Sequence, residues 1–206
     1  GEASRRVAYL PALAVCACGA GMHLLLDLTN DTGVKLIWPF SARWFAWDLA
    51  REVDPGLLAI LLAGLLLPAL LNLVGEEIGA RGRRRPGARG ALVALCLAAV
   101  YVGGRAVAHQ RAGALLNAHT YQQEAPIQVG AFPTVSPLLW RGVVETETAV
   151  HEIDVSLIPG AEFDARAARS QFKPEKSQAL QHAGASQAAQ KVVAFARFPK
   201  ARVEPT

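Results

Sequence analysis

Residues 57–74 read Leu-Leu-Ala-Ile-Leu-Leu-Ala-Gly-Leu-Leu-Leu-Pro-Ala-Leu-Leu-Asn-Leu-Val. No charged residue occurs on any helical face between Leu57 and Leu71. A buried helix of a soluble protein would instead carry a polar stripe with a period of about 3.6 residues. The stretch is close to the ~20 residues that span a ~30 Å hydrocarbon core, and it therefore predicts a transmembrane helix.

Two further apolar stretches have similar lengths, and they lie at residues 7–26 and 91–108. The sequence therefore predicts an α-helical membrane protein with three transmembrane helices, which together form a domain over residues 1–109. The first stretch could instead be a signal peptide, because Arg5 and Arg6 resemble a charged leader region. We favour the span, since the chain begins without methionine and we expect it to be a piece of a longer protein.

The overall composition excludes several classes of protein. Of the 206 residues, 52% are hydrophobic and 18% are charged, which excludes a disordered chain. Three cysteines cannot build a disulfide framework, so we expect them to be small packing residues.

The arginines indicate how the chain is oriented in the membrane. The loop from Arg81 to Arg89 carries five arginines and joins the second apolar stretch to the third. The positive-inside rule places such a loop in the cytoplasm, and the segment after His109 then lies outside it. Without a recognisable module or interleaved aromatic residues, we expect no nucleic acid as a partner. Contact with anionic lipid head groups is the expected secondary role.

The segment 110–206 is more polar, and it predicts a small extracytoplasmic α+β domain. In residues 150–157 apolar and polar residues alternate with a period of two, as in a half-buried strand. Further strands are predicted at residues 127–132 and 141–145, and helices are predicted at 161–171, at 174–183 and after the N-cap residue Ser186. Histidines 119, 151 and 182 are expected to be solvated.

Four polar residues fall within or at the ends of the apolar helices. His23 and Asp27 are spaced i, i+4, so they share one helix face, which suits two ligands of a metal or a carboxylate that orients an imidazole. The simpler alternative is a packing histidine bonded to a helix-end aspartate. Arg105 and His109 should lie at the same depth as this pair. Arg105 could neutralise Asp27, hold an anionic substrate group, or extend to the interface.

Aromatic residues crowd the loop between the first two helices. Trp38, Phe40, Trp44, Phe45 and Trp47 all lie there. Since tryptophan prefers the lipid head-group layer, we expect this loop to lie along the bilayer surface. The alternative is a platform that binds carbohydrate or lipid.

Four parts of the sequence are typical of one protein family: the run His-Leu-Leu-Leu-Asp-Leu-Thr-Asn-Asp-Thr-Gly from His23, Arg105 with His109, the segment 132–145, and Phe-Ala-Arg-Phe-Pro at 195–199. Together they resemble the membrane-bound metal-dependent hydrolase family of bacterial inner-membrane proteins. This resemblance implies a divalent metal ion, with zinc as the first choice, and it implies that His23 and Asp27 are two of the ligands. The family's upstream histidine motif has no counterpart here. We therefore expect either a trimmed chain or a lost metal site.

Two functions follow from these observations. The first is a membrane-embedded metal-dependent hydrolase, in which a metal-activated water attacks a phosphoester or lipid-like substrate. In this case Arg105 would stabilise developing negative charge, and His109 would complete the catalytic pair. The alternative is a non-enzymatic membrane-anchored interaction or envelope-stress protein.

Overall fold

The computed structural model describes residues 9–41, 43–77, 86–174, 184–187, 189–191 and 198. Three helices come first along the chain: α1 (Tyr9–Thr29), α2 (Pro55–Glu77) and α3 (Pro86–Asn117). Two of them, over Tyr9–Thr29 and Ala88–Asn117, are long and apolar enough to cross a membrane. The apolar part of α2, Pro55–Leu70, is shorter than these two. The arginine loop at residues 81–85 lies outside the described residues.

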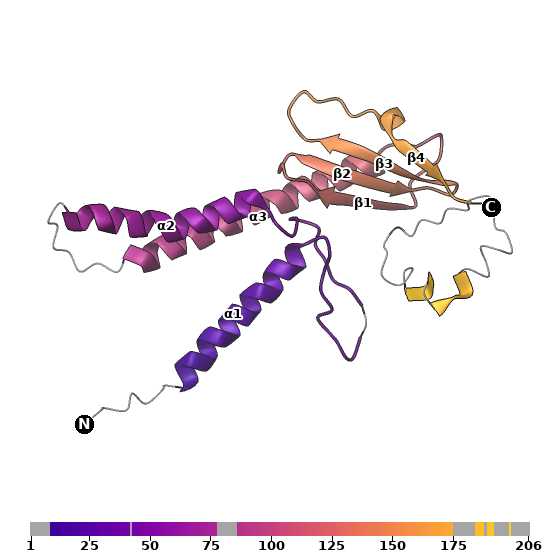
Figure 1. Ribbon diagram of the computed structural model, residues 1–206. Coiled ribbons are helices and arrows are strands. Elements are labelled where there is room, and N and C mark those ends of the chain that lie inside the picture. Colours follow the sequence, from indigo (N-terminus) through magenta and orange to yellow (C-terminus); the bar gives the residue numbers. More distant parts are fainter. Residues whose placement is uncertain are drawn as a thin grey trace, which may run out of the picture.

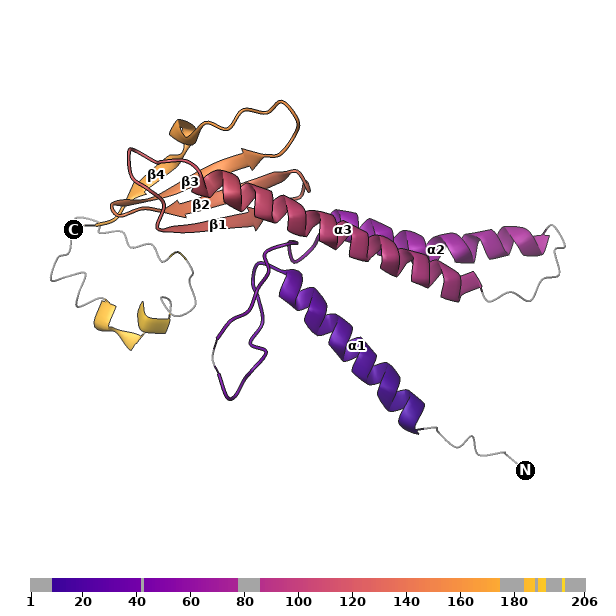
Figure 2. The same ribbon diagram turned by 180° about the vertical axis from the view of Figure 1, so that it is seen from behind.

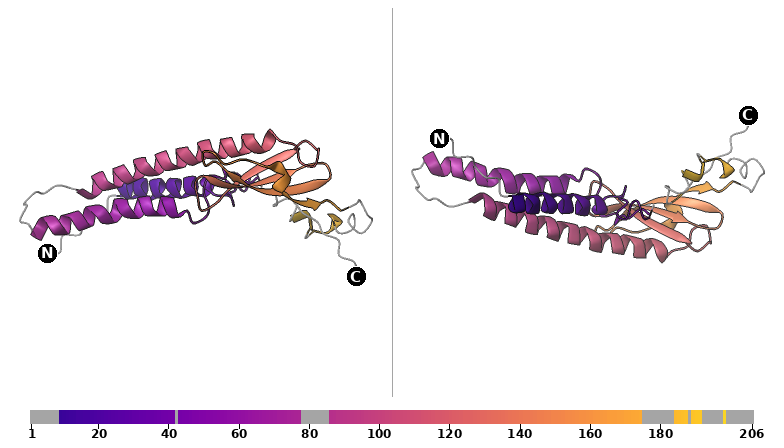
Figure 3. Two further views of the ribbon diagram at one scale, coloured as in Figure 1. Left: turned by 90° about the horizontal axis from the view of Figure 1, so that it is seen from above. Right: turned by 90° about the horizontal axis from the view of Figure 1, so that it is seen from below.

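The helices α2 and α3 lie side by side and antiparallel (Figures 1 and 3), whereas α1 diverges from this pair (Figures 1 and 2). Glycines allow α2 and α3 to approach closely. A Cβ atom added to Gly64 would lie 2.1 Å from Cβ of Ala94, and one added to Gly90 would lie 2.3 Å from Cγ of Pro68. The helix pair is therefore packed through contacts between small residues.

After α3 the chain forms an antiparallel sheet of four strands in the order β1 (Gln128–Pro133), β2 (Leu139–Glu145), β3 (Ala149–Ser156) and β4 (Arg169–Phe172). The strands predicted near residues 127–132, 141–145 and 150–157 are confirmed. Together with the end of α3, the sheet makes a small α/β domain.

The third helix extends nine residues beyond its predicted end at residue 108, up to Asn117. Its last turns lie against the sheet (Figure 2). There Ala112 and Leu116 are fully buried with Trp140, Val144 and other core residues. The helix continues because the sheet covers its apolar side chains and removes them from water.

The helix predicted over residues 161–171 is wrong. The structure has a short 3-10 helix, η1 (Ala165–Ala167), followed by β4, which pairs with β3 through His151 opposite Ser170. Alanine-rich composition favours a helix, but the open edge of β3 supplies backbone hydrogen-bond partners that outweigh this preference. Ser186 accepts a hydrogen bond from the Ala189 N–H, as an N-cap residue does. The helix predicted at 174–183 falls mostly outside the described residues.

Candidate functional site

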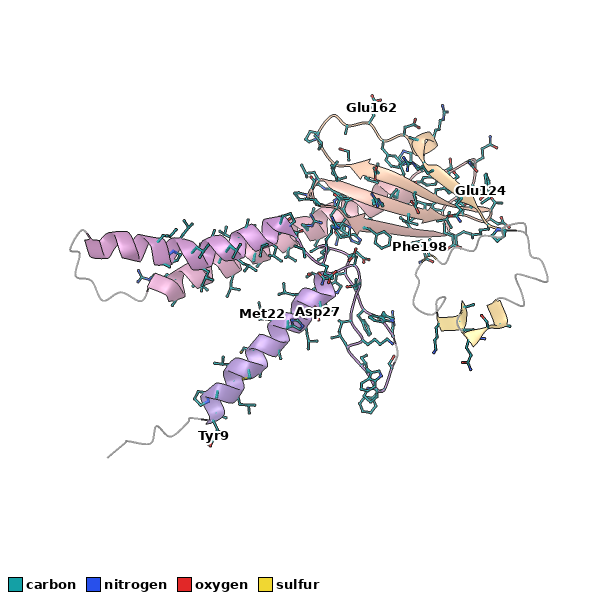
Figure 4. The ribbon with its side chains drawn as sticks, viewed as in Figure 1. Tyr9, Met22, Asp27, Glu124, Glu162 and Phe198 are labelled. Carbon is teal, nitrogen blue, oxygen red and sulfur yellow. The ribbon has the colours of Figure 1, made fainter. Side chains whose placement is uncertain are left out.

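The predicted metal pair lies in the last two turns of α1, near the end of the helix that faces the other elements (Figure 4). Nε2 of His23 and Oδ2 of Asp27 are 3.5 Å apart, and the side chains are 76% and 36% exposed. A zinc site needs three or four ligands. Among the residues that the structure describes, no group of three histidine, cysteine or acidic side chains gathers around one point. The pair therefore fits one half of a metal site.

The chain after α1 folds back onto the end of that helix. The Trp47 N–H donates to the carbonyl of Leu28 at 2.8 Å, and the Leu49 and Ala50 N–H groups donate to the carbonyl of Thr29 at 2.9 Å. The last carbonyl groups of a helix have no partner within the helix, so these bonds satisfy two of them. They also fix residues 47–50 directly beside the turn that contains Asp27.

Arg105 lies at the junction of the helices and the sheet, where it is only 2% exposed. Its Nε donates to the carbonyl of Leu49, and Nη2 donates to the carbonyl of Thr134 at 3.2 Å. Nη1 lies 3.6 Å from Oδ2 of Asp54, and the guanidinium lies 5.1 Å from the ring centre of Trp140. One side chain thus connects the segment that closes α1, the start of α2 and the loop between β1 and β2.

Asp54 is the N-cap residue of α2. Its Oδ1 accepts hydrogen bonds from the Leu57 N–H at 3.0 Å and from the Tyr101 hydroxyl at 2.8 Å. Pro55 occupies the first helical position, where a missing N–H costs nothing. The other carboxylate oxygen faces Arg105 in an ion pair that is almost completely removed from water. A buried charge needs such a partner, so Asp54 and Arg105 depend on each other.

Sequence reasoning expected Arg105 to neutralise Asp27, bind an anion or reach the interface. Its ionic partner is instead Asp54, and the guanidinium is covered by protein. His109, one turn further along α3, is half-buried, with its ring 5.5 Å from that of Trp140. Arg105 bonds to Leu49, whose N–H bonds to the carbonyl of Thr29 at the end of α1, whereas the common depth of the four residues in a membrane stays a prediction.

Asp54 and Tyr101 were not predicted from the sequence. One signal was present, since an aspartate followed by proline just before an apolar run is typical of a helix start. A second signal was the spacing of Tyr101 and Arg105, which are four residues apart and so share one face of α3. No local pattern, however, reveals that Arg105 would reach the carbonyls of Leu49 and Thr134.

A second polar cluster surrounds His151, which was expected to be solvated but is 1% exposed. Its Nδ1 is 2.8 Å from Oγ of Ser170, and its Nε2 is 3.3 Å from Oγ1 of Thr146. Burial lowers the pKa of His151, and the carboxylate of Glu124 partly opposes this change. The ring of Tyr121 stacks on the imidazole, and burial raises the pKa of Tyr121 to about 12. The buried imidazole of His151 thus connects β3 to Ser170 of β4.

A hollow of about 600 Å³ lies on the sheet beside η1. Charged side chains of both signs line it, among them Arg141, Glu152, Asp154, Glu162 and Arg169. Arg141 and Asp154 form an ion pair at 3.8 Å, but their side chains are largely exposed. Exposed pairs of this kind contribute little to stability, and the hollow is a solvated polar surface.

Comparison with known protein families gives a match over about half of the chain. Residues 3–112 match the family model described as YdjM inner membrane protein. The matched segment contains α1, the junction residues Asp54 and Arg105, and most of α3. Neither a curated protein nor a solved structure matches the chain.

Proposed function

Since the chain belongs to the YdjM inner membrane protein family, we propose that it is a multi-pass protein of the bacterial inner membrane that acts as a metal-dependent hydrolase. In this proposal α2 crosses the bilayer together with α1 and α3. Two observations support a crossing by α2. This helix is paired with α3 along its apolar length, and its sequence carries no charge from Leu57 to Leu71.

The observation that carries the proposal is the His23 and Asp27 pair. Its two side chains point toward one another from a single helix face, 3.5 Å apart. An imidazole nitrogen and a carboxylate oxygen are ligands that zinc accepts, and the further ligands would come from outside the described residues. A divalent ion bound there would lower the pKa of a water molecule and so supply hydroxide near neutral pH. A phosphoester or lipid-like substrate suits a site at the end of a membrane helix.

Within this proposal Arg105 and His109 have different tasks. Arg105 is a positioning residue, because its bond to Leu49 holds the segment that closes α1 just after Asp27. His109 is on the same face of α3, one turn further along, and is only half-buried. We assign proton transfer to His109, since histidine is the side chain that most often performs it.

The orientation in the membrane is also part of the proposal. The arginines between α2 and α3 favour a cytoplasmic loop, which would contact anionic lipid head groups. The sheet then lies on the extracytoplasmic side, together with the end of α1 that carries His23 and Asp27.

The test is metal content, measured by elemental analysis of the natural full-length protein purified in detergent. We expect His23→Ala and Asp27→Ala each to lower bound metal by about 10- to 100-fold or more, the scale found even for lost outer partners of metal ligands. His119→Ala is the control, because His119 bonds to the Leu115 carbonyl at the far end of α3 and should leave the metal in place. His109→Ala should keep the metal and lower hydrolysis. A wild-type protein without metal, or equal metal in all variants, would overturn the proposal.

The second candidate is a non-enzymatic membrane-anchored interaction or envelope-stress protein. The buried ion pair of Arg105 with Asp54 favours it, because an arginine committed to a structural pair cannot also bind a substrate anion. In that case His23 and Asp27 would form only a helix-end ion pair. Metal-free wild-type protein that is folded and stable would support this candidate.

A further inference from the structure

The loop between α1 and α2 is an ordered hairpin that backbone hydrogen bonds close at its base. The Val34 N–H donates to the Phe45 carbonyl at 2.8 Å, and the Phe45 N–H donates to the Val34 carbonyl at 2.9 Å. Gly33 precedes this pair with a φ of 73°, and a Cβ atom there would lie 2.7 Å from the Phe45 carbonyl oxygen. A glycine is therefore required at the base. We call residues 34–45 the aromatic hairpin.

The tip of the aromatic hairpin presents large apolar side chains that the described parts of the protein leave uncovered. Trp38 is 71% exposed and Phe40 is 93% exposed, and Leu36 and Ile37 are nearly half exposed. An apolar patch of this kind is unfavourable in water and marks a surface that meets a partner or a membrane.

Cations lie over the aromatic rings of the same hairpin. Nζ of Lys35 is 4.8 Å from the ring centre of Trp44, and the guanidinium of Arg43 is 5.3 Å from that of Phe45. In each pair the ring is apolar and the cation can bind an oxygen anion. The hairpin thus carries both kinds of group that the phospholipid interface requires, an apolar body and a positive charge for phosphate.

The position of the hairpin favours a lipid bilayer as its partner. The hairpin begins five residues after the apolar helix α1 ends, and residues 47–50 hold its return strand against that end. In Figures 1 and 4 the loop extends away from the sheet, on the side where α1 lies. The exposed side chains of the hairpin thus lie on the same side of the sheet as the exposed apolar side chains of α1.

We propose that the aromatic hairpin inserts its tip into the head-group layer of the membrane face on which α1 ends and the sheet lies, with Lys35 and Arg43 bound to lipid phosphate. The hairpin then sets the depth of the end of α1 in the bilayer. This role is independent of any metal chemistry, and it holds for either orientation of the protein.

Tryptophan fluorescence tests the proposal, because Trp38, Trp44 and Trp47 lie in or next to the hairpin whereas the remaining Trp140 is fully buried between α3 and the sheet. The protein would be placed in vesicles of phosphatidylethanolamine and phosphatidylglycerol, with or without bromine atoms on the acyl chains close to the glycerol. We expect the brominated lipid to remove most of the emission of the wild type. The control replaces the three hairpin-region tryptophans by phenylalanine, and its Trp140 emission should be quenched by a clearly smaller fraction.

Quenching by iodide in the aqueous phase distinguishes a hairpin in lipid from a hairpin that is exposed to water or covered by protein. Strong quenching by iodide with little quenching by brominated lipid would place the hairpin in water, where it would fit a soluble protein or carbohydrate, and would overturn the proposal. Weak quenching of the wild type by both reagents would show that protein covers the hairpin, which overturns it equally. Because these comparisons use the wild type alone, they hold even if the control variant fails to fold.

Discussion

Arg105 contacts Leu49, Asp54 and Thr134, each of which is at least 29 residues away from it in sequence, and its charge is balanced by Asp54 alone among the described residues. We expect Arg105→Ala to lower the free energy of unfolding by about 3–5 kcal/mol, because it leaves the Asp54 carboxylate buried without a counter-charge. Denaturation of the detergent-solubilised protein, followed by circular dichroism, measures this loss.

Arg105→Lys is the matched control for that prediction. A lysine keeps the positive charge but lacks the planar fork that reaches Leu49 and Thr134 together, so it should be intermediate between wild type and alanine. Equal stability of all three proteins would show that the pair does not hold the junction.

The buried imidazole of His151 makes the small α/β domain sensitive to acid. In the folded protein burial lowers the pKa of His151 below its ordinary value of 6.5, so the unfolded chain takes up a proton more readily than the folded one. Stability should therefore be unaffected by this group above pH 6.5 and should fall as the pH decreases below 6.5 toward the lowered pKa. Unfolding midpoints measured from about pH 8 down to pH 5 test the direction.

His151→Gln separates this effect from other titrations. Glutamine keeps a polar side chain between Thr146 and Ser170 but does not titrate, so the loss of stability just below pH 6.5 should disappear. Glu124 has a lowered pKa, chiefly through its hydrogen bonds to threonines, and its contribution is lost only on acidification below its ordinary 4.5. A pH profile that is identical in the variant would contradict the assignment to His151.

The helices α2 and α3 are in contact because two glycines lie where they cross. Gly64→Ala would place a methyl group 2.1 Å from Cβ of Ala94, so the helices must separate. We expect a loss of about 1–3 kcal/mol from this overpacking, measured as resistance to unfolding in detergent. Gly103→Ala makes the same chemical change on α3 where no atom lies within 4 Å, and it should be neutral or stabilise by up to about 1 kcal/mol. If both variants behave alike, the close contact does not stabilise the pair.

The sequence predicts those elements whose environment is uniform along their length. Residues 151–157 alternate because one face of β3 meets the core, and α1 is apolar over most of its length, so both were found within a few residues. The end of α3 was missed because Gln110 and Arg111 interrupt the apolar run, although Ala112 and Leu116 beyond them are buried by the sheet. β4 was missed because its strand character comes from pairing with β3 and not from its own composition.

In the candidate site, likewise, the sequence predicts local geometry but not contacts between distant segments. The face-to-face geometry of His23 and Asp27 follows from the helical spacing alone, and the structure shows it. The partner of Arg105 could not be found in this way, because it depends on how three segments fold together. A charged residue within an apolar helix indicates only that a partner exists.

The orientation proposed for the protein in the membrane can be measured by cysteine labelling. After replacement of Cys16, Cys18 and Cys96, single cysteines would be introduced at Thr32, Gly184 or Gly87. A membrane-impermeant reagent added outside the inner membrane should label the first two positions but not the third, because the arginines between α2 and α3 retain that loop in the cytoplasm. The reverse pattern would place His23 and Asp27 at the cytoplasmic face.

The unbroken course of α3 has a mechanical consequence. Its 32 residues measure roughly 48 Å at ~1.5 Å per residue, and its last turns are built into the hydrophobic core beneath the sheet. No flexible joint separates the two parts, so the sheet must follow each change in the inclination of the helix. A membrane helix adjusts its tilt when the bilayer becomes thinner or thicker, and a change of about 10° moves the far end of α3 by roughly 8 Å. In the membrane arrangement proposed above, the tilt and the height of the sheet over the lipid surface would therefore change with the thickness of the bilayer.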